Sequence, residues 1–416
     1  MIKDNKKIGG HLLADQLCAN GVDTIFCVPG ESYLGLMDGL YNHRDQIKLI
    51  TTRHESGAAN MADAYAKLTN KPGICLVSRG PGATNASNGI HTAFQDSTPL
   101  ILLIGQVSRN EREREAQQEI DYKEMFKPMA KYVAEINDAD RIPEFISKAF
   151  YISQSGRPGP VVLSLPEDML TDQTTSRTTS APDIFLSSPT KSAIANFYER
   201  LKTAKRPIII VGGNTWTKEA VSKLTKFVDE NSIPVLTSYR AQDRFDNRNE
   251  NYIGHSSYAI PPETRKKIEE SDFILALGAR LGEVTTQGYS TIKVPEPDQY
   301  LVHVHPDVNE IGSVYKPNIG IPSGMQEFTA ALSSLPKIER PPWTEWCKSG
   351  RREYLEFIKP TPMSGSLNLS EVIAYLNETL GDDDIIIVGS GNNSVSYTHL
   401  RAHETGRNLV CRLLLE

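Results

Sequence analysis

The stretch that decides the fold is GICLVSRGPGATN, at residues 73–85. Gly73 to Ser78 is a short apolar run typical of a strand, and Gly80-Pro81-Gly82 is a turn that lets the backbone approach a ligand closely. Ala83 and Thr84 then open a helical pattern. A plain strand-to-helix turn without a ligand is the alternative interpretation. In both interpretations the stretch predicts a strand followed by a helix.

Apolar runs of the same kind flank this stretch. They lie at residues 24–28, 48–52 and 99–104, with helical patterns between them. Runs separated by ~10 to 15 residues of helix are typical of βαβ units, whose parallel sheet is buried on both faces. We therefore expect one doubly wound domain over residues 1–170.

A second α/β domain is expected after a linker. Residues 171–192 are rich in Ser, Thr and Pro without periodicity, which is typical of a linker. The second domain should span residues 193–335. Its expected strands are 207–211, 233–237, 273–277 and 300–305, and its expected helices lie near 190–203, 217–230 and 263–270.

The rest of the chain predicts a connector and an incomplete third domain. Residues 336–364 contain several prolines around one short helix, 344–357, and are interpreted as a connector. Residues 365–394 restart a helix and a strand. Residues 395–416 show neither strand alternation nor a capped helix, so we expect a non-native tail on a truncated domain. The predicted fold class is α/β, with two complete doubly wound parallel-sheet domains plus the start of a third.

Composition favours small-molecule chemistry in a reducing compartment. The 416 residues predict about two to four domains. The 45 Lys and Arg against 51 Asp and Glu, without like-charge blocks, exclude an electrostatic footprint for nucleic acid or an anionic membrane. The 5 cysteines form no C-x-x-C pair, and the longest apolar run is far shorter than a membrane span. We expect a cytoplasmic protein.

Several motifs together resemble one enzyme family. The segments are FCVPGE at 26–31, RHESGAANMADAYA at 53–66, GPGATN at 80–85, DSTPL at 96–100 and GQV at 105–107. In this order and spacing they resemble the pyrimidine-binding domain of thiamine diphosphate enzymes, in the acetolactate synthase-like group. Residues 211–213, 277–280 and 303–307 are similar to that family's central domain, and residues 365–394 resemble the start of its diphosphate-binding domain.

Glu55 is the candidate catalytic residue. Without the family, a carboxylate in the first turn of a helix is explained by the helix macrodipole alone. The resemblance implies a different role: in the family this glutamate hydrogen-bonds N1′ of the aminopyrimidine and favours the imino tautomer that deprotonates the thiazolium. A carboxyl group buried against a heterocycle can share a proton rather than stay charged.

The resemblance also implies a set of cofactor-binding residues. These are Pro29, Gly30, Glu31, Ser78, Pro81, Asn85, Gln118, Gly391 and Asn392. Gln117 and Glu31 depart from the acetolactate synthase pattern, where an aromatic and a small residue are usual. A cleft lined by Gln117, Gln118 and Glu31 indicates a substrate more polar than pyruvate.

No metal ligand is assigned. The family holds magnesium on a Gly-Asp-Gly segment and a later Asn, which this sequence lacks. His303 and His305 point to one face of a strand, but without a third ligand we interpret them as buried histidines with satisfied hydrogen bonds. Arg280 matches relatives that bind FAD, whereas the following residues and the absence of G-x-G-x-x-G do not, so FAD stays an open alternative.

The resemblance implies a thiamine diphosphate- and magnesium-dependent carboligase or decarboxylase acting on a 2-oxo acid. In the family the site lies between subunits, which implies a homodimer or homotetramer. The alternative is a non-catalytic truncated fragment that lacks the diphosphate and magnesium site. Cofactor-dependent activity of the 416-residue chain separates the two hypotheses, and we expect that activity to be absent or feeble.

Overall fold

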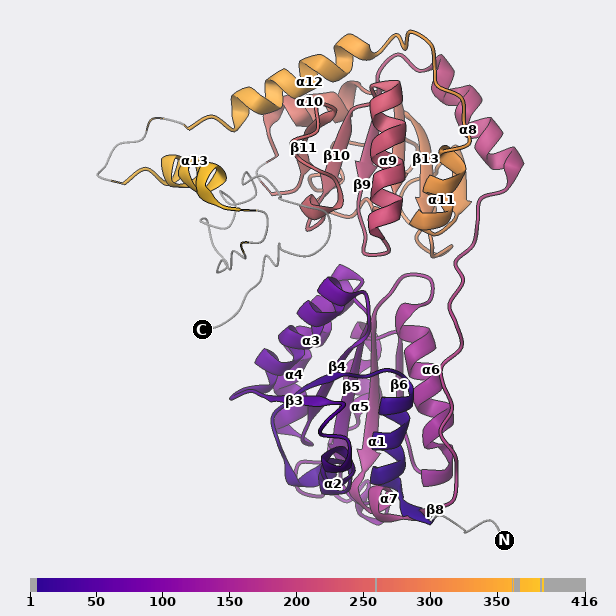
Figure 1. The fold of residues 1–416 in the computed structure, drawn as a ribbon, viewed down its shortest axis with the longest axis vertical. Coiled ribbons are helices and arrows are strands. Elements are labelled where there is room, and N and C mark those ends of the chain that lie inside the picture. Colours follow the sequence, from indigo (N-terminus) through magenta and orange to yellow (C-terminus); the bar gives the residue numbers. More distant parts are fainter. Residues whose placement is uncertain (1–5, 259, 361, 363–366, 382–383, 385–416) are drawn as a thin grey trace. The chain divides into compact units, whose positions relative to one another are not determined.

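The computed structural model describes residues 6–258, 260–360, 362, 367–381 and 384. The predictions for Gly391, Asn392 and the tail at 395–416 lie outside these residues. The chain divides into two compact units, with the boundary between Phe185 and Leu186. Each unit is built around its own sheet (Figure 1). No helix in the described ranges is long and apolar enough to cross a membrane.

The first unit contains a six-stranded parallel sheet in the order β3-β2-β4-β5-β7-β6. The strands are β2 (Thr24–Cys27), β3 (Lys48–Thr51), β4 (Gly73–Val77), β5 (Leu100–Gln106), β6 (Tyr132–Glu135) and β7 (Pro160–Pro166). Every residue of β4, β5 and β7 is buried. Strands covered on both faces have no polar side to expose, which explains their continuous apolar sequences.

Helices cover both faces of this sheet (Figure 1). One face is covered by α1 (Gly9–Ala19), α2 (Leu34–Asn42), α6 (Ile142–Gln154) and α7 (Glu167–Thr171). The other is covered by α3 (Glu55–Thr69), α4 (Pro81–Asp96) and α5 (Tyr122–Phe126). Small residues bring α3 and α4 together, since a Cβ atom on Gly89 would lie only 2.5 Å from Cβ of Ala59.

The segment predicted as a linker, residues 171–192, begins with contacts to the first unit. β8 (Gln173–Thr174) pairs antiparallel with β1 (Lys7–Ile8). Further along, the Gln16 side chain accepts a hydrogen bond of 2.9 Å from the backbone N–H of Thr179. The sequence shows no periodicity here because contacts with α1 and the N-terminal strand, rather than an apolar face, hold the segment.

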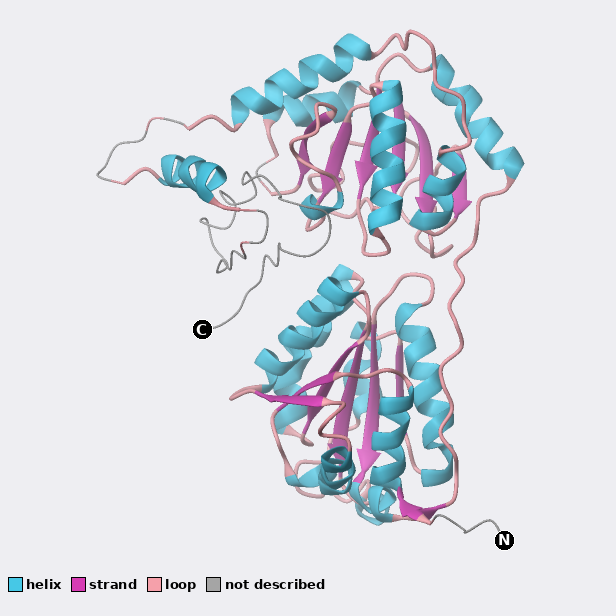
Figure 2. Cartoon of the chain, viewed as in Figure 1, coloured by secondary structure: helices cyan, strands magenta, loops and turns pink. Residues whose placement is uncertain are grey.

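The second unit contains another six-stranded parallel sheet, in the order β11-β10-β9-β12-β13-β14. Figure 2 shows the strands of this sheet as magenta arrows with cyan helices beside them. The strands are β9 (Pro207–Val211), β10 (Val235–Ser238), β11 (Tyr252–Ser256), β12 (Phe273–Leu277), β13 (Tyr300–His305) and β14 (Ile319–Pro322). Counted within this unit, the order is 3-2-1-4-5-6, as in doubly wound dinucleotide-binding domains. The prediction of an α/β chain with doubly wound parallel sheets is confirmed.

The described helices of the second unit include one that the sequence analysis assigned to a connector. They are α8 (Lys191–Thr203), α9 (Lys218–Asn231), α10 (Pro262–Glu270), α11 (Met325–Leu332), α12 (Thr344–Phe357) and α13 (Leu369–Thr379). The predicted bounds of α12 are confirmed, but the helix packs into this unit. Trp343, just before it, is fully buried and donates from Nε1 to the carbonyl of Asn231 at 2.9 Å. Arg351 binds the carbonyls of Asn247 and Tyr252 at 2.9 and 3.1 Å.

Candidate functional site

The candidate site lies at the carboxyl edge of the first sheet, where the strand order reverses. From β2 the chain passes to β3 on one side, and β4 pairs with the other side of β2. Loops that follow such neighbouring strands diverge, and ligands of open α/β sheets bind in the crevice between them. In this unit the two loops are residues 28–33 after β2 and residues 78–80 after β4.

These two loops are in direct contact. A Cβ atom on Gly30 would lie 2.7 Å from Cβ of Ser78, so only glycine fits at this position without a shift. Ser32 is fully buried, and its Oγ lies 2.9 Å from Oγ of Ser78. The same Ser32 oxygen accepts the backbone N–H of Arg79 at 3.2 Å. The hydroxyl of Ser32 therefore fixes the end of β4 to the loop after β2.

Tyr122 and the loop before α5 also contact the turn after β4. Gly80 has φ +58°, and its backbone N–H donates to the buried hydroxyl of Tyr122 at 2.8 Å. A Cβ atom on Gly80 would lie 2.6 Å from Cβ of Gln118, so the loop before α5 rests on this turn. Burial raises the pKa of the Tyr122 hydroxyl above its ordinary value of 10.0. Tyr122 therefore stays protonated and keeps its place in the turn.

Glu55 and Asn85 meet beside this turn. Glu55 is the first residue of α3, and Asn85 lies one turn into α4. Nδ2 of Asn85 donates to Oε2 of Glu55 at 2.9 Å. The other carboxylate oxygen, Oε1, accepts no hydrogen bond within the part of the chain that the structure describes. A Cβ atom on Gly82 would lie 3.4 Å from this Oε1, so glycine leaves space next to it.

The structure brings some of the predicted site residues together and leaves others apart. Asn85 contacts Glu55, Gly30 contacts Ser78, and the loop containing Gln118 contacts Gly80. Pro29 and Glu31 are exposed in the loop after β2, and Pro81 is exposed as the first residue of α4. No described contact joins Pro29, Glu31 or Pro81 to Glu55.

Sequence reasoning missed Ser32 and Tyr122. Ser32 directly follows the quoted motif at residues 26–31, and this position next to a Pro-Gly turn was the available sequence signal. No local pattern marks Tyr122, because its partner is more than forty residues away in the chain. Only the fold brings that hydroxyl to the backbone N–H of Gly80.

The two histidines of β13 are not arranged as metal ligands. His303 Nε2 lies 2.9 Å from the carbonyl of Ala279, and His305 Nδ1 accepts the backbone N–H of Asp307 at 3.0 Å. Burial lowers the pKa of both rings, and for His305 the value falls to about 4. Among the described residues no group of three or more His, Cys, Asp or Glu side chains gathers as a metal site would require.

The second unit has its own contact at the carboxyl edge, between the tips of β9 and β12. A Cβ atom on Gly213 would lie 2.5 Å from the carbonyl oxygen of Gly278, so both tips need glycine. Arg280 follows, and its Nε lies 3.2 Å from a carboxylate oxygen of Glu310. As in the first unit, the strand order reverses between these two strands.

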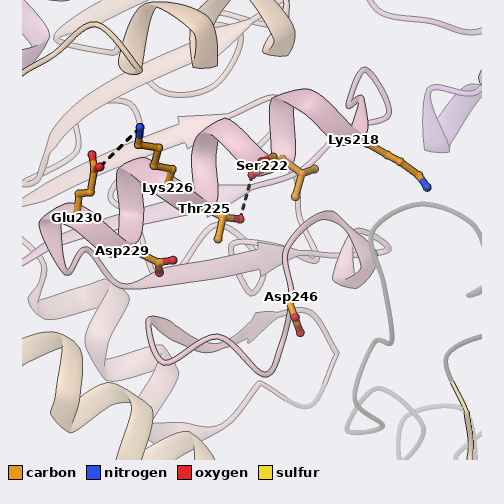
Figure 3. A pocket seen from close by; sticks show the side chains of 8 residues that line it. Lys218, Ser222, Thr225, Lys226, Asp229, Glu230 and Asp246 are labelled. Atoms are coloured by element: carbon orange, nitrogen blue, oxygen red, sulfur yellow. Dashed lines mark hydrogen bonds and ion pairs between the residues drawn. The ribbon is translucent and has the colours of Figure 1, made fainter.

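A groove on the outer side of α9 is a weaker candidate for a catalytic site. Its volume is about 480 Å³, and side chains of both charges line it (Figure 3). The carboxylate of Asp229 accepts hydrogen bonds of 2.9 Å from Asn249 and Asn251, and Asp246 pairs with Arg248 at 3.0 Å. Since its acidic groups are engaged within the protein, we do not assign a catalytic site to this groove.

Comparison with known proteins agrees with the two units. Residues 7–125 match the family described as thiamine pyrophosphate enzyme, N-terminal TPP binding domain, and residues 194–332 match thiamine pyrophosphate enzyme, central domain. The acetolactate synthase large subunit of Lactococcus lactis subsp. lactis is 29% identical over 97% of this chain and 70% of its own length. That of Haemophilus influenzae is 33% identical over 74% of this chain and 54% of its own length. The acetolactate synthase of Mycobacterium bovis is 28% identical over 93% of this chain and 64% of its own length. The chain thus spans between about half and 70% of these relatives.

Proposed function

The chain belongs to the thiamine pyrophosphate enzymes, with the N-terminal and central domains of an acetolactate synthase-like protein, and we propose that it uses thiamine diphosphate to act on a 2-oxo acid. The proposed reaction breaks or forms a carbon–carbon bond next to a carbonyl, as a decarboxylase or carboligase does. Similarity to enzymes along almost the whole chain does not favour the alternative of a non-catalytic fragment.

The observation that carries this proposal is the carboxylate of Glu55, oriented on one side and open on the other. Asn85 binds Oε2 at 2.9 Å and so fixes the plane of the carboxylate. Oε1 has no hydrogen-bond partner among the described residues, and Gly82 leaves space beside it. A fixed acceptor next to open space fits a ring nitrogen that exchanges a proton with the carboxylate.

The cofactor and the protein have separate tasks in this proposal. When bound, thiamine diphosphate supplies a carbon nucleophile and an electron sink for cleavage next to a carbonyl. Glu55 holds a proton at Oε1 and shares it with the bound pyrimidine. Asn85 keeps that carboxylate in one orientation, because its amide donates only to Oε2. Ser32 and Tyr122 hold the backbone of the turn that precedes α4.

Magnesium, flavin and the assembly state complete the proposal. We assign no magnesium ligand within the described residues, where no suitable group of side chains is found.

FAD is a candidate ligand of the second unit, because its strand order is that of dinucleotide-binding domains and the tips of β9 and β12 are glycines in contact. Visible absorbance of the purified protein tests for flavin. A homodimer or homotetramer is expected, and light scattering measures it.

Binding of thiamine diphosphate tests the proposal. Calorimetric titration of the full-length protein with thiamine diphosphate and magnesium should show saturable binding. The variant Gly82→Ala should bind more weakly, because its methyl group occupies the space beside Oε1 of Glu55. The matched control Gly282→Ala changes a glycine of the second unit that has no atom near its Cβ position and no positive φ. Absence of binding to the unsubstituted protein would overturn the proposal.

A further inference from the structure

The loop between β5 and α5 has an unusual backbone. Three of its residues that are not glycine have positive φ values: Glu113 at 60°, Glu115 at 55° and Gln118 at 67°. Such conformations are uncommon for residues with a Cβ atom, and each costs free energy that other contacts must offset. Three such conformations within six positions therefore need strong contacts nearby that stabilise them.

Glu119 supplies the contacts that hold this loop. Its Oε1 accepts the backbone N–H of Glu113 at 2.8 Å, and its Oε2 accepts the backbone N–H of Ala116 at 3.2 Å. The same carboxylate lies 3.4 Å from Nε of Arg112, and only 12% of its side chain is exposed. One side chain thus closes the loop on itself.

The loop is also anchored to the sheet. Arg112, paired with Glu119, forms a second ion pair of 3.1 Å with Glu135 on β6. Glu135 in turn accepts the hydroxyl of Ser164 on β7 at 3.1 Å. The chain of contacts runs from Glu119 to the edge strand β6 and its neighbour β7, so the sheet of the first unit sets the position of the loop.

The loop ends on the turn beside the candidate site. Gln118 directly precedes Glu119, and its backbone oxygen would lie 2.9 Å from a Cβ atom on Gly80. Gly80 is followed by Pro81, where α4 begins. Gln118, whose φ is +67°, is therefore the residue of this loop that contacts the turn after β4.

We propose that Glu119 is a positioning residue: its carboxylate folds residues 112–119 and thereby holds Gln118 against the turn at Gly80. This inference rests on the proposed function and on the expectation, from the family resemblance, that Gln118 binds the cofactor. Glu119 itself acts only through Gln118 and has no contact with reacting atoms.

The chemistry of the contacts explains why a glutamate is required. Two amide N–H groups and a guanidinium converge on its two oxygens, and charged acceptors make the stronger hydrogen bonds. The N–H of Glu113, with that of Ala116 and with Arg112, holds the pKa of Glu119 below its ordinary value of 4.5. A glutamine would turn an NH₂ group toward one of these donors, and an aspartate would be one methylene too short to reach both amides.

Hydrogen exchange measures the loop without any enzyme assay. In Glu119→Gln, the amides of Glu113 and Ala116 should exchange about tenfold faster or more, the factor expected for losing a charged acceptor. The melting temperature and exchange elsewhere in the first unit should stay unchanged. Glu115→Gln is the matched control, since its exposed side chain lies in the same loop. Unchanged exchange in Glu119→Gln would overturn the proposal.

A double-mutant cycle tests whether Glu119 acts through Gln118. In the full-length enzyme, Glu119→Gln should lower kcat/KM by roughly tenfold, and Gln118→Ala by at least as much. If Glu119 works by positioning Gln118, adding Glu119→Gln to Gln118→Ala should change kcat/KM by less than about twofold. Additive losses would contradict the proposal. Failure of the proposed function is distinguishable, because it removes cofactor binding but leaves the exchange result intact.

Discussion

The amide of Asn85 donates a hydrogen bond of 2.9 Å to the carboxylate of Glu55 and so links the N-terminal ends of α4 and α3. The two helices can support this contact because Gly89 lets α4 approach Ala59 on α3 closely. Glu55 therefore has a defined orientation although it lies at a helix end and is only half-buried.

Substituting Asn85 with Asp should change the pH dependence of activity. A second carboxyl group would lie about 3 Å from that of Glu55, and like charges at this distance favour sharing a proton. We expect a pH–rate profile displaced toward higher pH, together with a loss of about 10-fold or more in kcat/KM at neutral pH. A profile identical to that of the parent enzyme would show that Asn85 does not control Glu55. Asn88→Asp, on an exposed position of the same helix, is the control.

Removing the hydroxyl of Ser32 should destabilise the first unit. In Ser32→Ala the backbone N–H of Arg79 loses its acceptor inside the protein, which costs about 1–3 kcal/mol. Denaturant unfolding followed by far-ultraviolet circular dichroism measures the change in free energy of unfolding. Ser87→Ala is the control, because that hydroxyl only binds a carbonyl of its own helix. A loss no larger than that of the control would contradict the bridging role of Ser32.

Gly82→Ala should weaken cofactor binding without lowering the melting temperature. Alanine favours a helix over glycine by about 1 kcal/mol, and its methyl group would make ordinary contact at 3.4 Å with Glu55. We expect an unchanged or higher melting temperature together with weaker cofactor binding. Calorimetry and thermal unfolding of the same samples provide both values. Weaker binding accompanied by a lower melting temperature would indicate general damage instead of a filled site.

The buried histidines should make the stability of the second unit depend on pH. In the unfolded chain a histidine takes up its proton near pH 6.5, whereas burial lowers the pKa of His305 to about 4 and also lowers that of His303. Between these values the unfolded state binds more protons, so the free energy of unfolding should fall as the pH drops below 6.5. His305→Asn should flatten this dependence between about pH 6.5 and 5, above the range in which most carboxylates titrate. Thermal unfolding across that window measures the slope, and an unchanged slope would contradict the assignment.

Strong apolar periodicity made much of the fold predictable from the sequence. The predicted bounds of β9, β12, β13 and α12 agree with the structure, because each is a continuous apolar run or an amphipathic pattern. β6, β7, β11 and β14 were not predicted. β7 is fully buried, but its sequence PVVLSLP begins and ends with proline, and β14 is a short edge strand with only one buried residue. These strands are stabilised by their neighbours in the sheet more than by a local pattern.

The candidate site was predictable only in part. Glu55 and Asn85 follow from the resemblance of their segments to a known family, and the structure places the two side chains in contact. Tyr122 and Glu119 have no local signal, because their roles depend on a distant backbone N–H and on three positive φ angles. Contacts across the sheet edge exist only after the chain has folded.

Consumption of a 2-oxo acid by Glu55→Gln tests the central claim most directly. With thiamine diphosphate and magnesium present, the full-length parent should consume substrate, and Glu55→Gln should retain about 1% of its rate or less, the loss typical of a missing acid-base group. Glu144→Gln, an exposed glutamate on α6, should match the parent. If Glu55→Gln stayed within about threefold of the parent, well below the loss expected for such a group, Glu55 could not have the proposed role.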